Sequence, residues 1–257
     1  MAIERVPLIS RVPKNEFWIT DEQQIRDLFG DKNIHLMVNP AVETHLTVMT
    51  DQETDIDPYR HSARCASDTL FSEASHLFPT RPKAADTLWG PVPGVEFQAN
   101  PLFVSILRGA RPLELCIEKL YPNAPIVPIS ASRDPHDPWQ AHITTQNPKF
   151  PPPDNWHIAM VDMTCATGGT FRAAGNALRD FRLISSDYSQ VTNLSLISVF
   201  TSVPGLQRIF QDFPYIHVYT SRIIFNLDER CYMIGGPGDA GLRCSYDLAT
   251  IRRMRVH

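Results

Sequence analysis

The segment WHIAMVDMTCATGGTFRAAGNALRDF, residues 156–181, predicts a buried strand, a glycine turn and an amphipathic helix in direct succession. The apolar run holds one carboxylate, Asp162, just before the turn. The expected helix carries its apolar residues on one stripe, namely Phe171, Ala174, Leu178 and Phe181. Backbone N–H groups at the start of a helix lack partners and carry the positive end of the helix dipole. The segment therefore predicts an anion site where the strand meets the helix.

The same alternation of apolar strand and amphipathic helix continues on both sides of this segment. Strands are expected at 102–107, 124–130, 191–200 and 215–221, and helices at 111–121 and 203–213. Apolar strands that alternate with amphipathic helices are typical of a parallel sheet. The predicted fold class is therefore α/β, a parallel sheet flanked by helices on both faces. In such sheets a ligand lies beyond the carboxyl ends of the strands.

The rest of the chain is less regular. Helices are expected over 20–31, with Thr20 or Asp21 as the cap, and over 57–78, while the Pro- and Gly-rich stretch 79–97 indicates a loop or hairpin. Residues 130–155 hold six prolines without clean periodicity, which predicts a long flexible loop that is either functional or disordered. We expect a single domain over 1–257, with an N-terminal helical extension over about 1–60.

Composition excludes several classes of protein. The net charge of −4 disfavours a broad nucleic-acid face. The sequence has no run of about 18 apolar residues, and its N-terminus carries charges and prolines where a signal peptide needs an apolar run, so a cytoplasmic protein is expected. The five cysteines form no CxxC pair, which disfavours a disulfide framework or a zinc site. Cys165 lies in the glycine turn, and the alternatives for it are a packed thiol or a nucleophile without a companion histidine.

The turn and the carboxylate together suit one ligand. Glycines let the backbone approach a phosphate closely, and Thr167 and Thr170 add hydroxyl donors. Asp162 could accept hydrogen bonds from ribose hydroxyls, so a ribose 5-phosphate fits both groups. The alternative is an ordinary strand–turn–helix in which glycine serves close packing.

Five motifs in the same order resemble uracil phosphoribosyltransferases. VDMTCATGGTFRAAGNAL is similar to that family's phosphoribosyl-diphosphate loop, commonly VDPMLATGGSA. FVSILRGARPLELCIEKLYPNAPI resembles its ILRAGLGM…IPNA segment, SRDP resembles YRDP, LDERCYMIGGPGDAGLR resembles LNEKGYIVPGLGDAGDR, and THLTVMTDQETDIDPYR resembles an N-terminal motif. The matches span roughly residues 35 to 245.

The resemblance implies a reaction and a set of site residues. The family joins uracil to phosphoribosyl diphosphate with Mg2+, giving UMP and diphosphate. By position in the motifs, Arg108 and Arg133 would contact the diphosphate and Asp162 the ribose. The residues implied for the 5′-phosphate cradle are Ala166, Thr167, Gly168, Gly169 and Thr170. The residues implied for a uracil-binding hood, over about 224–245, are Tyr232, Ile234, Gly236, Gly238, Asp239, Ala240 and Gly241. No protein ligand for the metal is assigned.

The chain departs from the family pattern around the base and ribose. Leu242 stands where the hood has an aspartate, and Ile224 replaces another carboxylate. The family's RAGL is RGAR here, and the N-terminal LRD is MTD without its arginine. Two lost carboxylates replaced by apolar residues would make the hood less polar, whereas the phosphate-handling motifs are better kept.

Three functions remain open from the sequence. The first is uracil phosphoribosyl transfer in pyrimidine salvage. The second is a diverged enzyme on the same scaffold, either one that transfers to another acceptor base or one that ionises another diphosphate, such as a non-canonical terpene synthase acting on an allylic diphosphate. A hydrophobic substrate of this kind predicts an apolar cavity lined by Ile224, Phe225 and Leu242. The third is a non-catalytic regulatory relative with a large exposed interface patch. The resemblance also implies a homo-oligomer and a small-molecule diphosphate substrate. Net charge and the lack of a long apolar run predict neither a nucleic-acid partner nor a membrane span.

Other residues of the long loop have two interpretations each. His136 and His142 are general acids or, as we favour, solvated side chains. Trp139 and Phe150 seal the closed site or pack against a neighbouring subunit.

Overall fold

A computed structural model describes residues 17–98, 101–145, 148–151, 156–187 and 191–254. Its elements along the chain are α1 (Glu22–Phe29), β1 (Ile34–Leu36), α2 (Pro40–Thr50), α3 (Ile56–Ala74), the 3-10 turn η1 (Ser75–Leu77), β2 (Thr80–Thr87), β3 (Gly90–Phe97), β4 (Pro101–Leu107), α4 (Arg111–Leu120), β5 (Ile126–Arg133), β6 (Ala141–Ile143), β7 (His157–Cys165), α5 (Gly169–Asp180), β8 (Leu194–Ser202), α6 (Val203–Asp212), β9 (His217–Ile224), α7 (Ala240–Ser245) and α8 (Leu248–Met254). The expected N-terminal extension lies partly outside these residues, because 1–16 are not described.

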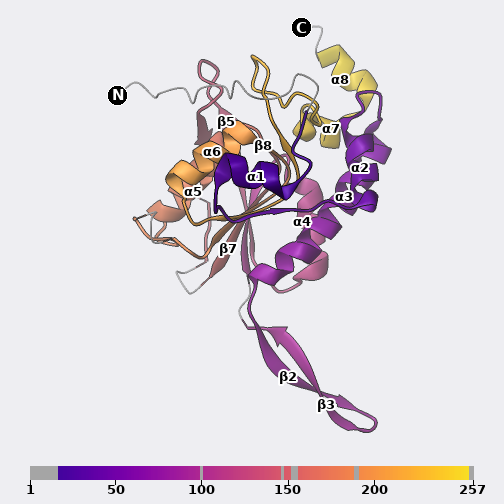
Figure 1. Cartoon of the computed structure of the whole chain (residues 1–257), viewed down its shortest axis with the longest axis vertical. Coiled ribbons are helices and arrows are strands. Elements are labelled where there is room, and N and C mark those ends of the chain that lie inside the picture. Colours follow the sequence, from indigo (N-terminus) through magenta and orange to yellow (C-terminus); the bar gives the residue numbers. More distant parts are fainter. Residues whose placement is uncertain (1–16, 99–100, 146–147, 152–155, 188–190, 255–257) are drawn as a thin grey trace.

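Most of these elements surround one seven-stranded sheet (Figure 1). Its strand order is β1-β9-β8-β7-β4-β5-β6, with parallel pairing except between β5 and β6. Parallel strands buried on both faces read as continuous apolar runs, and this is the pattern of β4, β7 and β8. The predicted α/β class is confirmed. Strand β1 was not indicated by the sequence pattern; it adds an edge beside β9 within the segment expected to be helical.

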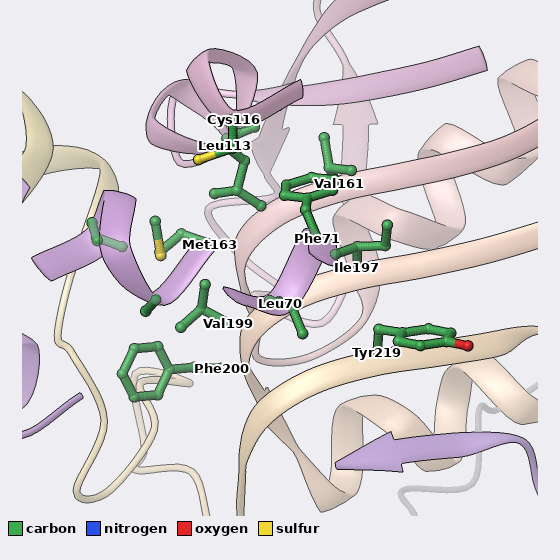
Figure 2. Packing of buried hydrophobic residues seen from close by; sticks show 14 of the residues in the cluster. Leu70, Phe71, Leu113, Cys116, Val161, Met163, Ile197, Val199, Phe200 and Tyr219 are labelled. Carbon is green, nitrogen blue, oxygen red and sulfur yellow. The ribbon is translucent and has the colours of Figure 1, made fainter. Parts of the chain in front are cut away.

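Alternate strand residues enter two separate cores. On β7, Ala159, Val161 and Met163 join the core under α2, α3, α4 and α7, shown in Figure 2. Their neighbours Ile158 and Met160 join the core under α1, α5 and α6 on the other face. The helices thus cover both faces of the sheet, because successive strand side chains point to opposite sides.

Local signals define several helix ends. Asp21 caps α1 by accepting a hydrogen bond from the Gln24 N–H at 2.9 Å, and Gly30 ends it with φ at 62°. Asn39 caps α2 and Ser202 caps α6, each with a proline in the first turn of its helix. These residues fix where the helices begin.

Two sequence expectations need correction. The segment 130–155 is not wholly loop: β5 continues to Arg133 and pairs antiparallel with β6, and the Thr145 hydroxyl accepts the Ser130 N–H at 2.6 Å. Phe181 does not complete the buried stripe of α5. It follows the helix, is 44% exposed, and packs on Phe150 with ring centroids 4.8 Å apart.

The stretch 79–97 is a hairpin rather than a loop. Strands β2 and β3 pair over their whole length and extend away from the sheet and its helices (Figure 1).

Among the described residues, no helix has both the length and the apolar character that crossing a membrane requires.

Candidate functional site

Three segments far apart in the sequence meet beyond the carboxyl ends of β4 and β7. A Cβ placed on Gly109 would lie 2.1 Å from the Asp162 Oδ1, so the turn after β4 rests directly on that carboxylate. A Cβ on Gly241 would lie 3.8 Å from the Arg108 Cβ and 4.0 Å from the Gly109 nitrogen. The structure therefore brings together Arg108, Asp162 and the segment expected to form the hood.

Asp162 is a buried carboxyl, with 8% of its surface exposed. Burial raises its pKa to about 7, although the Met163 and Thr164 N–H groups and the charge of Arg133 lower it, and Asp239 adds a smaller increase. The Met163 N–H donates to Oδ1 at 2.7 Å. A carboxyl with this pKa changes charge near neutral pH, and buried groups of this kind often mark functional sites.

The glycine turn forms the start of α5. Gly168 has φ at 72°, a conformation that favours glycine, and the Gly169 N–H donates to the Thr167 hydroxyl at 3.3 Å. The helix begins at Gly169 and has no side-chain capping bond. Helix α6 packs closely behind, since a Cβ on Gly168 would be 2.9 Å from the Gly205 carbonyl oxygen. The turn thus presents backbone donors and hydroxyls in the form expected of an anion cradle.

The loop between β5 and β6 lies on this turn. The Thr167 hydroxyl donates to the Pro138 carbonyl oxygen at 3.4 Å. A Cβ on Gly169 would be 2.6 Å from the Trp139 carbonyl oxygen, so this close approach requires glycine. The predicted loop and the predicted cradle are therefore in direct contact.

Arg208 of α6 joins the loop to the turn. Its Nη1 donates to the Trp139 carbonyl oxygen at 2.5 Å and to the Thr167 carbonyl oxygen at 3.2 Å. Only 6% of Arg208 is exposed. Sequence reasoning missed this residue, yet a signal was present: within VPGLQRIFQDF the arginine lies three residues after Gly205 and next to Ile209, on the buried face of the helix.

Comparisons with known proteins agree with this architecture. The family model for uracil phosphoribosyltransferase matches residues 36–244. The chain belongs to the uracil phosphoribosyltransferase family. It is 28% identical over 213 residues to the uracil phosphoribosyltransferase of Campylobacter fetus, covering 82% of this chain and 97% of that one. It is 29% identical over 210 residues to the chloroplastic enzyme of Arabidopsis thaliana, covering 80% of this chain and 68% of that one.

A solved structure shows the same fold. The AQ2163 protein from Aquifex aeolicus superposes with a TM-score of 0.72 at 20% identity, covering 82% of this chain and 97% of that chain. The identity supports likeness of fold alone. Family membership and fold together account for the order of the five motifs.

The second arginine of the uracil phosphoribosyltransferase pattern lies at the end of β5. Arg133 is exposed, its guanidinium carbon is 5.9 Å from the centre of the Tyr232 ring, and its charge lowers the pKa of Asp162. It therefore lies near both the hood and the buried carboxyl. Arg133 and Arg108 approach the same region from different strands.

The hood is held from behind by Arg243. Its guanidinium donates to the carbonyl oxygens of Met49 at 2.6 Å, Asp51 at 2.7 Å and Thr54 at 3.0 Å, and it stacks on the Tyr59 ring. This contact gives the N-terminal family motif a structural role, because its carbonyl groups anchor the hood. Asp239 caps α7 by accepting the Leu242 N–H at 2.9 Å.

The departures from the family pattern do not line one apolar cavity. Ile224 is fully buried in the core beneath α3, while Phe225 belongs to the core on the opposite face. Ile224 also supports the hood, since a Cβ on Gly236 would be 3.1 Å from its Cδ1. The cavity expected from Ile224, Phe225 and Leu242 is therefore wrong, because β9 ends at Ile224 and the next residue, Phe225, packs into the core on the other face of the sheet.

Four further side chains named in the sequence analysis lie outside the proposed chemistry. The buried Cys165 thiol has its pKa raised by burial, so it is not poised as a nucleophile. His142 lies in solvent 3.6 Å from Asp134, and His136 is exposed, as the solvated interpretation predicts. Trp139 packs on Arg208, 5.4 Å from ring centre to guanidinium carbon.

Proposed function

We propose that the chain transfers a ribose 5-phosphate group from phosphoribosyl diphosphate to uracil, forming UMP and diphosphate. The observation that carries this proposal is the convergence of the Arg108–Gly109 turn, Asp162 and the Gly241 end of the hood. Each belongs to a separate family motif. Their meeting at the carboxyl ends of parallel strands supports one site for the whole reaction.

Each segment then has a role in binding. The backbone donors and hydroxyls of 166–170 hold the 5′-phosphate, and Asp162 accepts hydrogen bonds from the ribose hydroxyls. Arg108 and Arg133 bind diphosphate oxygens, since a guanidinium matches phosphate geometry. In the hood, the backbone groups of 232–241 bind the polar edge of uracil.

These groups act on the departure of diphosphate from the sugar. Positive charge develops at C1 of the ribose while negative charge collects on the leaving group. The arginines stabilise the leaving diphosphate, and the ionised carboxylate of Asp162 stabilises the cationic sugar. Fixed positioning of uracil against C1 provides the rest of the rate enhancement.

The residues fit a Mg2+ ion that is bound mainly by the substrate. Among the described residues, no group of three or more His, Cys, Asp or Glu is arranged to hold a metal. Mg2+ commonly uses one or two carboxylates together with substrate phosphates and waters, and Asp162 offers such a carboxylate. The ion would neutralise charge on the diphosphate when bound.

We also propose that the protein is a homo-oligomer joined through the β2–β3 hairpin. A two-stranded hairpin alone is marginally stable in water, and this one exposes Leu88 and Trp89 at its tip, at 95% and 92%. Glu96 pairs with Arg81 and Lys83 across the strands, which holds the register. Apolar side chains presented on a projecting arm suit a second copy of the chain. The cytoplasmic location expected from the sequence stays a prediction.

The first experiment is a product assay. Purified protein with Mg2+, phosphoribosyl diphosphate and uracil should yield UMP by mass spectrometry, and the Asp162→Ala variant should not. A parallel incubation with farnesyl diphosphate, extracted for hydrocarbons, tests the allylic alternative. Hydrocarbon without UMP would replace the proposal, and the absence of both products would favour a non-catalytic role.

A further inference from the structure

The loop carbonyl groups occupy positions that suit phosphate oxygens. The carbonyl oxygens of Pro138 and Trp139, which are consecutive in the chain, both point at the glycine turn. One accepts from the Thr167 hydroxyl, and the other lies against Gly169 and accepts from Arg208. A hydroxyl, a glycine backbone and a guanidinium are the donors that bind phosphate in proteins.

Arg208 is a buried cation bound to neutral partners. Its two hydrogen bonds, both from Nη1, reach backbone carbonyl oxygens, and no ion pair among the described residues includes it. The nearby carboxylate Asp212 pairs with Arg172 instead. Burial, followed by the charge of Arg172, lowers the pKa of Arg208, but an arginine stays charged. The charges of Asp212 and Asp137 partly offset the cost of burying this charge, but neither carboxylate forms a direct ion pair with Arg208 among the described residues, so an anion in direct contact would be favoured.

We infer that Arg208 is a phosphate-binding residue of the cradle and that the 138–139 segment blocks the cradle until phosphate displaces it. This inference deepens the proposed function and rests on it for the identity of the phosphate. The dianionic group replaces the two neutral carbonyl oxygens and supplies the direct ion-pair partner that Arg208 lacks among the described residues. The Trp139 ring over the guanidinium stabilises the blocked state, since a cation attracts the face of an indole.

The test measures binding of ribose 5-phosphate by titration calorimetry, without turnover. Arg208→Gln should weaken binding tenfold or more. Arg179→Gln is the matched control, because it removes the same charge from the exposed end of α5, and it should bind within twofold of the wild type. Wild-type affinity in Arg208→Gln would overturn the inference.

A second variant, Arg208→Lys, provides a test if Arg208→Gln does not fold. Arg208→Lys keeps the charge but loses the planar pair of donors, and it should bind at least threefold more weakly with an unchanged melting temperature. Equal affinity in a folded Arg208→Lys, where Arg208→Gln is unfolded, would count against Arg208 as a ligand of phosphate.

The blocking role of the 138–139 segment predicts a change in affinity of the opposite sign. Trp139→Ala removes the ring that stabilises the blocked state, so it should bind ribose 5-phosphate at least threefold more tightly than the wild type. Ligand should also change the tryptophan emission of the wild type but not that of Trp139→Phe. Unchanged or weaker binding by Trp139→Ala would refute the block.

Failure of this inference is distinguishable from failure of the proposed function. If the wild type forms no UMP but Arg208→Gln still weakens ribose 5-phosphate binding, the proposed function is refuted and the role of Arg208 is supported. If Arg208→Gln forms UMP with the wild-type KM for phosphoribosyl diphosphate, the proposed function is supported and the role of Arg208 is refuted.

Discussion

Asp162 lies in the buried end of β7, and the Gly109 turn closes over its carboxyl group. Its pKa near 7 has a consequence for stability. The folded protein keeps this proton to about pH 7, whereas an unfolded chain releases it near the ordinary aspartate pKa of 3.8. The folded state therefore binds more protons between these values, and stability falls as pH rises through that window.

Replacing this carboxyl by an amide should stabilise the fold while removing activity. We expect Asp162→Asn to raise the free energy of unfolding by about 4 kcal/mol at pH 8, and by about 1 kcal/mol at pH 4.5. Denaturant unfolding at both pH values measures this difference, with the exposed Asp180→Asn as control. A variant no more stable than the wild type at pH 8 would show that the native carboxyl is not raised in pKa.

Arg108 offers a second test at the level of a single residue. We expect Arg108→Ala to lower kcat/KM for UMP formation by at least tenfold, or about 1.4 kcal/mol of transition-state stabilisation. The reason is the loss of a guanidinium beside the leaving diphosphate. Steady-state rates give the answer, with Arg26→Ala on the exposed face of α1 as control. Wild-type rates in Arg108→Ala would show that the diphosphate does not bind at this turn.

At the scale of elements, α7 and the hood are positioned by a helix junction far away in the sequence. The carbonyl groups between the end of α2 and the start of α3 accept from Arg243, and the Arg60 Nε donates to the Cys244 carbonyl oxygen at 2.8 Å. Ile224 supports the hood from the sheet side. The apolar replacement of a family carboxylate is thus part of the packing under the hood.

Removing the Arg243 anchor should loosen the hood. We expect Arg243→Met to destabilise the protein by about 3 kcal/mol, because several buried carbonyl groups lose their donor. In variants that remain folded, KM for uracil should rise more than KM for phosphoribosyl diphosphate. Unfolding curves and steady-state kinetics measure both effects.

The control for this variant is Arg252→Met, which breaks an exposed pair with Glu53 and should change stability by less than about 0.5 kcal/mol. If Arg243→Met and Arg252→Met have equal effects on stability, the anchor is not energetically important.

At the scale of the whole molecule, the β2–β3 hairpin departs from the compact arrangement of sheet and helices (Figure 1). All eight residues of β2 are exposed. Such an arm buries little apolar surface of its own, so contact with a second copy of the chain would add to its stability.

Polar substitution at the hairpin tip should therefore dissociate the protein. We expect the wild type to be an oligomer by light scattering, and the Leu88→Ser/Trp89→Ser variant to have a lower mass at equal concentration. Leu115→Ser, on an exposed position of α4, is the control. A monomeric wild type, or an unchanged mass in the double variant, would contradict the proposed contact.

The alternation of strands and helices, the two buried faces of the sheet and the family can all be inferred from the amino-acid sequence. Each depends on short-range patterns: the period of apolar residues, capping residues and ordered motifs. It also indicated that Asp162 and the glycine turn meet at one strand end, because they are adjacent in the chain.

Contacts between groups far apart in the chain became visible in the folded structure alone. Arg208 contacts a carbonyl 69 residues away, and Arg243 contacts one 194 residues away. The opposite burial of Ile224 and Phe225 likewise follows from the place of β9 inside the sheet. Such contacts depend on how whole elements pack, and a backbone carbonyl leaves no side-chain signal in the sequence because every residue carries one.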